Sequence, residues 1–382
     1  MAKLSYEELK SVVATFVDEQ KIAVDTFTAT RDNTVGLLDK IGKIFTIDTS
    51  YIDKLSMFEG EELSFGKTIE EWQEDLKLPE SFNSSGSSTL APHEGTYRPV
   101  AYSYTLGKTT FPITIRNNDI ERAVHFVEQF VSIIAMKSKR LYDSVAVWRY
   151  QVKRQMLAVL AGMCEDASGL GSSYSGETMV FNKAYAVNSL VRSASSGQNI
   201  KYGIVVKPVK SGDYANWAGA VADGAVIVYD GLVEELAIPV DTSTGEAFIK
   251  SIKKSVEIAS DLSEGHSLNG NTLGSAEAGL VLLLKQGVMP EVEVDVIAGA
   301  FHESKVAIPA EVKVIKDFGD NASGVYAMLI DARGLRLHNT YRAVRDQQNA
   351  QGDFLNMFYH TEDTAFISRN TFVKVYRVPS AS

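Results

Sequence analysis

Few side chains in this sequence are spaced for catalysis or for metal binding. The six histidines are scattered, and no two stand four residues apart as a helical zinc site requires. The only cysteine, Cys164, has no neighbouring feature that indicates an activated thiolate. No G-x-S-x-G motif occurs. We therefore predict no catalytic residue, no metal site, no cofactor-binding residue and no enzymatic activity.

Two glycine-rich stretches come near to phosphate-binding motifs. Residues 265–272, GHSLNGNT, have the glycine spacing of a P-loop, but Asn271 stands where that loop needs a lysine to meet the phosphate charge. Residues 169–177, GLGSSYSGE, follow a predicted helix and lack the third glycine of a dinucleotide-binding loop. Both are predicted to be ordinary loops. The stretch Gly265–Thr272 is the only feature that favours an enzyme.

Charge is distributed unevenly along the chain. Residues 1–80 hold 17 acidic and 9 basic side chains, whereas six bases between residues 137 and 154 face one acid, Asp143. The net charge of the whole chain is -10. Such opposite segments either pair within one chain or between copies, or they form solvated surfaces. No zinc finger or basic zipper occurs, so only loose contact with nucleic acid is open to the basic segment.

Length and composition indicate a globular protein of one large domain or two lobes. The chain has 382 residues, of which 45% are hydrophobic and 23% charged. One cysteine rules out a disulfide framework and fits a reducing compartment. The N-terminus lacks the apolar stretch of a signal peptide, and the longest aliphatic run is too short to cross a bilayer. We therefore expect a soluble protein that makes no contact with a membrane.

The first part of the chain reads as an arm followed by a long hairpin. Ser5 and Glu8 fit a capping box, which predicts a helix near residues 5–21. Side chains that alternate in polarity between 100 and 115 predict strands. The Ser-, Gly- and Pro-rich stretch 83–95 predicts a mobile tip between two strands within residues 61–115. Because an isolated hairpin is marginal in water, we expect this one to pack on another surface.

A long helix is predicted from a cap at Asn117, Asn118 or Asp119 to about Ala161, either continuous or broken near Met136. Its second half carries an apolar stripe with helical spacing: Leu141, Val145, Trp148, Val152, Met156 and Val159. The bases that fall mostly on the other side are Lys139, Arg140, Lys153 and Arg154. We predict one face that packs on a sheet and a basic face for solvent or a charged partner.

Beyond residue 170 the pattern changes to mixed α/β. A helix is predicted at 245–261 and another at 289–301, where proline and acids mark an N-terminus. Strands are predicted at 202–209, 224–232, 278–284, 311–318 and 324–331, with at least two more in 353–378.

In this order, the elements resemble the major capsid proteins of tailed bacteriophages with the Hong Kong 97-type fold, and most of all those of small podoviruses of the phi-twenty-nine kind. The segments that carry the resemblance are FGKTIEEWQEDL (65–76), FPITIRNNDIERAVHFVEQFVSII (111–134), PEVEVDVIAGAF with EVKVIKDF (290–318) and GDFLNMFYHTEDTAFISRNTFVKV (352–375). They are spread from about residue 60 to 378. No cross-linking role is carried onto Lys67.

The resemblance implies an α+β chain with five regions. These are an N-terminal arm (1–60), an extended β-hairpin loop (61–116), a peripheral domain with a long spine helix (117–170), a mainly axial α/β domain (171–351) and closing strands (352–382). It implies copies that assemble as hexamers and pentamers into an icosahedral head around double-stranded DNA. The expected partners are scaffolding and portal proteins and non-specifically contacted DNA, and the expected location is the virion, assembled in the bacterial host cytoplasm.

In shells of this kind the extended loop lies over the peripheral domain of a neighbouring subunit. The loop is acidic here and the helix basic, so we predict that Glu70, Glu71, Glu74 and Asp75 meet bases of an adjacent copy. Trp72, Tyr102 and Tyr104 would supply apolar burial. Two other interpretations stay open: an encapsulin-type compartment shell and, more distantly, an uncharacterised α/β enzyme.

Overall fold

The computed structural model describes residues 51–63, 66–71, 103–116, 127–170, 176–194, 200–229, 231–270, 279–288, 310–319, 322 and 324–379. The predicted helices near 5–21 and 289–301 and the loop tip lie outside these residues. The chain divides into two units, each built from three separate stretches. Unit 1 contains Met1–Thr68, Tyr104–Lys153 and Leu337–Ala365, and unit 2 contains Ile69–Ser103, Arg154–Arg336 and Phe366–Ser382.

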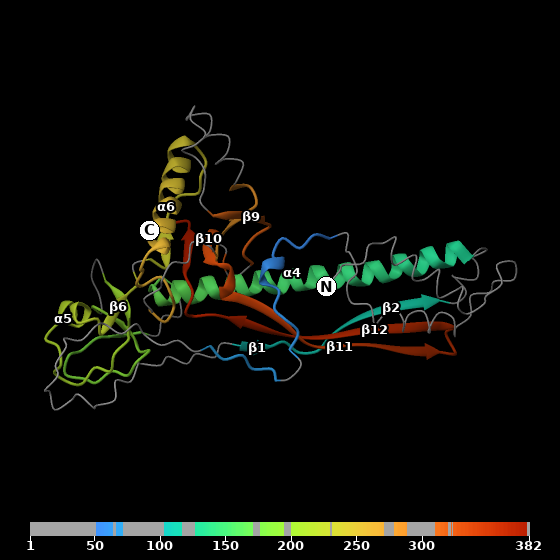
Figure 1. Cartoon of the computed structure of the whole chain (residues 1–382), viewed down its shortest axis with the longest axis horizontal. Coiled ribbons are helices and arrows are strands. Elements are labelled where there is room, and N and C mark those ends of the chain that lie inside the picture. Colours follow the sequence, from blue (N-terminus) through green and yellow to red (C-terminus); the bar gives the residue numbers. More distant parts are fainter. Residues whose placement is uncertain are drawn as a thin grey trace, which may run out of the picture. The chain divides into compact units, whose positions relative to one another are not determined.

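Unit 1 is organised around a sheet formed by strands distant in sequence (Figure 1). Strand β12 (Phe354–Ile367) pairs with β11 (Leu335–Asn349) on one side. On its other side it pairs with β1 (Ser103–Thr105) and with β2 (Thr109–Arg116), the latter antiparallel from Phe354↔Arg116 to Thr361↔Thr109. The predicted strand at 111–115 is therefore present, and that at 100–106 is present at Ser103–Thr105, whereas residues 100–102 lie outside the described residues. Both strands lie along the edge of β12, a pairing that the alternation of side chains did not reveal.

The helix α4 (Val127–Ala167) contributes residues to both units and is continuous through Met136. In unit 1 its aromatic side chains contact those of the sheet: Trp148 meets Phe111 at 5.9 Å between ring centroids, and Tyr142 meets Tyr359 at 6.1 Å. The predicted apolar stripe is confirmed at Leu141, Val145, Val152 and Met156, which are buried. It is wrong at Val159, which is 39% exposed.

Unit 2 contains a five-stranded sheet covered by one helix (Figure 1). The strand order is β7 (Val233–Glu235), β13 (Val373–Arg377), β10 (Val325–Asp331), β8 (Leu280–Lys285) and β9 (Glu311–Ile315). Helix α6 (Thr242–Ser260) begins with a capping box between Asp241 and Thr244. Its buried side chains, Phe248 and Ile252 among them, pack on Leu282, Leu329 and their neighbours. The predictions for this helix and for strands β8, β9 and β10 are confirmed.

A second, smaller sheet of unit 2 has the order β3 (Glu177–Thr178), β4 (Leu190–Arg192), β5 (Tyr202–Val205) and β6 (Val226–Val228). Helix α5 (Trp217–Ala222) packs on it, capped by the side chain of Asn216. Residues 265–270 form a loop, as predicted. None of the helices in the described residues is both long and apolar enough to cross a membrane.

The described residues also contain 3-10 turns at Ser56–Phe58 and at Ala332–Gly334. The first belongs to residues 51–71, which we call the strap. In unit 1 the strap follows β11: Gly60 N–H donates to Leu337 O at 3.0 Å and Leu63 N–H donates to Asn339 O at 2.9 Å. Its side chains Leu55 and Phe58 are fully buried.

Candidate functional site

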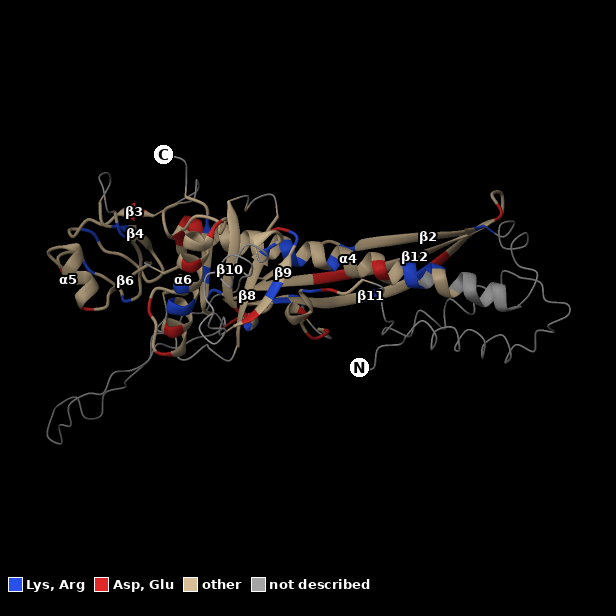
Figure 2. Cartoon of the chain, turned by 90° about the horizontal axis from the view of Figure 1, so that it is seen from above, with Lys and Arg blue, Asp and Glu red and all other residues tan. Residues whose placement is uncertain are grey.

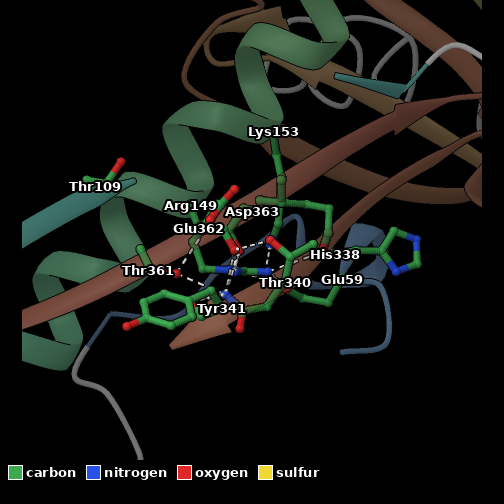
Figure 3. A network of polar contacts seen from close by, with 12 residues as sticks. Glu59, Thr109, Arg149, Lys153, His338, Thr340, Tyr341, Thr361, Glu362 and Asp363 are labelled. Atoms are coloured by element: carbon green, nitrogen blue, oxygen red, sulfur yellow. Dashed lines mark hydrogen bonds and ion pairs between the residues drawn. The ribbon is translucent and has the colours of Figure 1, made fainter. Parts of the chain in front are cut away.

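A polar cluster among the described residues of unit 1 joins the strap to α4 and to β12 (Figure 3). Lys153 Nζ donates to Asp53 Oδ2 at 2.5 Å and also pairs with Glu59. Arg149 pairs with Glu59 and with Asp363. The five side chains therefore form one alternating chain of charge, Asp53–Lys153–Glu59–Arg149–Asp363.

Burial sets the energetic weight of this ion network. The side chains of Lys153 and Asp363 are fully buried, and that of Arg149 is only 12% exposed. Taking such charges out of water costs several kcal/mol per ion, so a buried cation is tolerated only when acids surround it. Removing one partner leaves an uncompensated charge, which is the costly event. The network therefore holds the strap in one place in unit 1.

Hydrogen bonds fix the orientation of the acid at the end of the network. The amide nitrogen of Asn339 donates to Asp363 Oδ1 at 3.0 Å, and Thr361 Oγ1 donates to Asp363 Oδ2 at 3.2 Å. Arg149 also donates to the carbonyl of Leu337 at 3.2 Å. These contacts leave Asp363 with a donor on each oxygen, as a buried carboxylate requires.

The pKa values reflect these contacts. Burial acts to raise the pKa of Glu59, but the charges and hydrogen bonds of Arg149 and Lys153 outweigh burial and hold this pKa below its ordinary value. For Arg149, burial acts to lower the pKa, and the attraction of Glu59 and Asp363 raises it instead. Both groups are therefore ionised at neutral pH. Glu59 and Arg149 stay ionised and ion-paired, so they are suited to stabilising the fold and not to transferring a proton.

The strap has a second set of contacts after Gly66, whose φ is +77°. In unit 1 Lys67 pairs with the buried Glu362. In unit 2 the backbone N–H of Ile69 donates to Ser103 Oγ at 3.3 Å, and Ser368 Oγ lies 2.8 Å from both carboxylate oxygens of Glu71. The strap is thus tied within unit 1 up to Lys67 and within unit 2 at Ile69 and Glu71.

The acidic segment predicted for inter-subunit contact is described only at its beginning. Glu70 is exposed, whereas Glu71 is half-buried and engaged with Ser368 of its own chain. Tyr104 is described and is 67% exposed in β1. The remaining predicted contact residues, Trp72, Glu74, Asp75 and Tyr102, lie outside the described residues.

The predicted basic face of the long helix is not continuous, and in Figure 2 α4 carries blue only in short stretches. Lys153 does not lie on an exposed face: it is 1% exposed and pairs with two acids of the strap. Arg154 pairs with Asp317 in unit 2. Arg140 is exposed and Lys139 is half-buried. The correction has a physical reason, because acids distant in sequence pair with these cations: Asp53 and Glu59 with Lys153, and Asp317 with Arg154.

Sequence reasoning missed Asp53, Glu59, Arg149, Asn339 and Asp363 as members of one cluster. One signal was present: Glu362 and Asp363 lie in β12 shortly before the apolar residues 365–367, and acids are almost never fully buried unless paired. The identity of their partners had no local signal. Among the described residues, no group of three or more His, Cys, Asp or Glu side chains is placed to hold a metal ion.

Comparisons with known proteins agree with this architecture. A family model described as Phi29-like phage major capsid protein matches residues 3–375. No curated protein matches the chain in sequence. Among solved structures, a chain in the capsid structure of Staphylococcus phage Andhra is similar, with a TM-score of 0.54, 9% identity, and coverage of 87% of this chain and 86% of that chain. A chain in the structure of the head fiber and inner core protein gp22 of native bacteriophage P68 is also similar. Its TM-score is 0.52 and its sequence identity 11%, and the match covers 87% of this chain and 87% of that chain.

Proposed function

The chain belongs to the family of Phi29-like phage major capsid proteins, and on that premise we propose that its copies assemble as hexamers and pentamers into an icosahedral head around double-stranded DNA. The observation that carries the proposal is the match of the family model to residues 3–375, nearly the whole chain. The resemblance to an encapsulin-type shell has no match of this kind in its favour.

Within the Hong Kong 97-type fold, we assign α4 as the spine helix and the segment that follows the strap as the extended loop. The length of α4 supports the first assignment, because 41 residues in one helix are unusual for a globular domain. The predicted regions follow: an arm at 1–60, the loop at 61–116, a peripheral domain at 117–170, a mainly axial domain at 171–351 and closing strands at 352–382. The sheet of unit 2 with α6 is the proposed core of the axial domain.

The function that follows is structural, without a catalytic step or a cofactor. Symmetric self-association is the activity, and a closed shell is its product. Scaffolding and portal proteins are the proposed partners, assembly takes place in the cytoplasm of the bacterial host, and the finished protein resides in the virion. A net charge of -10 suits a container that must hold DNA without gripping it, since strong phosphate binding would impede packaging and release.

Electron microscopy of the full chain expressed in bacterial cytosol tests the proposal. The protein is purified alone and again after co-expression with the scaffolding protein of the same phage. Closed shells or sheets of hexamers in either preparation are the expected result. Dispersed monomers in both preparations, with a cooperative thermal transition that shows a folded subunit, would contradict it.

A further inference from the structure

Glu71 differs from the other acids of the strap in the kind of partner that it has. Its two carboxylate oxygens both lie 2.8 Å from Ser368 Oγ. Ser368 Oγ in turn accepts the backbone N–H of Asn370 at 3.1 Å, so its own proton is directed toward Glu71. No ion pair of Glu71 occurs among the described residues, in contrast to Glu59, which has two.

The turn that holds Glu71 is itself rigid. Ser368 and Asn370 are 4% and 5% exposed. The amide of Asn269 donates to Asn370 Oδ1 at 2.7 Å, and its backbone N–H donates to the carbonyl of Arg369 at 2.9 Å. All of these residues belong to unit 2. Because the turn at residues 368–370 is buried and hydrogen-bonded, it binds the Glu71 carboxylate in a defined position.

The chain beyond Glu71 returns to the described part of unit 2 at Ser103, and the two ends of this excursion are close. Ile69 N–H donates to Ser103 Oγ at 3.3 Å. Ser103 also begins β1, which pairs with β12, so the chain is held where it re-enters the described residues. The bonds between Glu71 and Ser368 hold the chain at the other end, two residues after Ile69.

We propose that Glu71 is a positioning residue for assembly: its carboxylate, anchored on residues 368–370 of its own chain, sets the direction in which the chain leaves toward the proposed extended loop. The inference rests on the proposed function. It departs from the expectation that Glu71 contacts bases of an adjacent copy, and it leaves that role to Glu70, which is exposed.

The contact between Glu71 and Ser368 depends on Glu71 as a hydrogen-bond acceptor and not on an ion pair. Burial raises the pKa of Glu71, and the hydrogen bonds from Ser368 and its neighbours lower it by less. Ser368 contacts the carboxylate as a hydrogen-bond acceptor, through both of its oxygens. Gln keeps one acceptor oxygen at the same distance from the backbone and should preserve part of the anchor, whereas Ala should remove it.

Limited trypsin digestion and shell yield test the inference together. Between Glu71 and Ser103 the sequence offers trypsin one site, Lys77, since Arg98 precedes Pro99. The variants are Glu71→Ala, Glu71→Gln and Ser368→Ala, each in the full chain. Glu70→Gln, which neutralises the adjacent exposed acid, is the matched control for digestion. Digestion is followed on unassembled subunits, and shells are counted by electron microscopy after sedimentation.

We expect cleavage at Lys77 to become about tenfold faster in Glu71→Ala and in Ser368→Ala, the factor for the loss of about one hydrogen bond. Shell yield should fall in both, with the thermal transition of the subunit little changed. Glu71→Gln should lie between the wild type and Glu71→Ala in both readouts, and Glu70→Gln should resemble the wild type in digestion. A Glu71→Ala protein that forms wild-type shells and is cleaved at the wild-type rate would overturn the inference and leave the proposed function intact. Failure of the wild type to form shells with its scaffold present would instead contradict the proposed function.

Discussion

Lys153 and Asp53 are a hundred residues apart in sequence, and Nζ of the lysine lies 2.5 Å from Oδ2 of the aspartate. The lysine side chain is fully buried, on a face of the helix that was predicted for solvent or a charged partner. This pair begins the ion network that holds the strap in unit 1. Arg149, Lys153 and Arg154 of α4 form ion pairs within the subunit, so only the other basic side chains of this helix are available for contacts with other copies.

Replacing Lys153 by Ala should lower the free energy of unfolding by about 1.5–3 kcal/mol, because Asp53 and Glu59 would then lose their hydrogen bonds from a shared buried cation. Thermal and urea unfolding of the unassembled subunit measure this loss. Arg140→Ala is the control on the same helix: Arg140 is exposed, and its removal should change stability by less than about 0.5 kcal/mol. Equal effects of the two substitutions would mean that Lys153 is not buried in solution.

The network should also give the subunit an acid-sensitive component of stability. The folded-state pKa of Glu59 is below its ordinary value, so the unfolded state binds a proton more readily than the folded state. The contribution is present above the ordinary pKa of a glutamate and is lost as pH falls through the lowered folded pKa. Glu59→Gln should therefore be less stable than the wild type at pH 7, and the difference should shrink below about pH 4.3. A difference that stays constant between pH 7 and pH 3 would contradict the assignment.

Reversing two acids at the start of the proposed loop should impair assembly without unfolding the subunit. We expect Glu70→Lys with Glu74→Lys to reduce shell yield, since these acids are proposed to meet bases of an adjacent copy, each pair contributing about 0–1 kcal/mol. Adding Arg140→Glu to the same chain should restore part of the yield, because every interface then carries the reversed pair. Particle counts and subunit melting temperatures measure both effects. An unchanged shell yield in the variant with Glu70→Lys and Glu74→Lys would contradict the proposed contact.

Gly231 in unit 2 should not tolerate a side chain. A Cβ there would lie 2.0 Å from Nε2 of His266. The imidazole cannot swing away, since it stacks on Phe372 at 5.4 Å and its Nδ1 is 2.8 Å from the carbonyl of Glu264. Gly231→Ala should destabilise the subunit by about 1–3 kcal/mol, as overpacking does.

The control for this substitution is Gly219→Ala. Gly219 lies in α5, and an added Cβ would meet only Asn216 Oδ1, at an ordinary 3.5 Å. Because Ala is a better helix former than Gly, this variant should be stabilised by up to about 1 kcal/mol. A chemical denaturation series on both proteins separates the two outcomes, and equal stability of the variants would argue against the packing around Gly231.

Local patterns were sufficient to predict most elements of regular structure. The alternation at Phe111, Ile113 and Ile115 and the helical spacing from Phe248 to Ala259 are properties of neighbouring residues, and both elements occur as predicted. The pairing of β2 with β12 is different, because it joins residues about 240 positions apart and each strand alone is compatible with several partners. Sequence alternation therefore predicted the strands but not the sheet.

The candidate site was harder to predict for a related reason. Lys153 and Arg154 are consecutive bases, yet one is buried between two acids and the other is paired with Asp317. Only the partner distinguishes them, and the partner is supplied by tertiary structure. Glu70 and Glu71 are also adjacent residues of the same type in different surroundings. Successive side chains of an extended chain point to opposite sides, so Glu70 is exposed and Glu71 contacts Ser368.

Each unit is built from stretches that are far apart in the sequence, and this affects how early the subunit can fold during synthesis. Unit 1 cannot complete its sheet until residue 365 has been synthesised, and the five-stranded sheet of unit 2 cannot form before β13 (Val373–Arg377) has followed. Until then the apolar stripe of α4 has no sheet to cover it. Contacts across such long sequence separations slow folding and prolong the exposure of apolar surface. Both units should therefore fold only after most of the described chain has been synthesised.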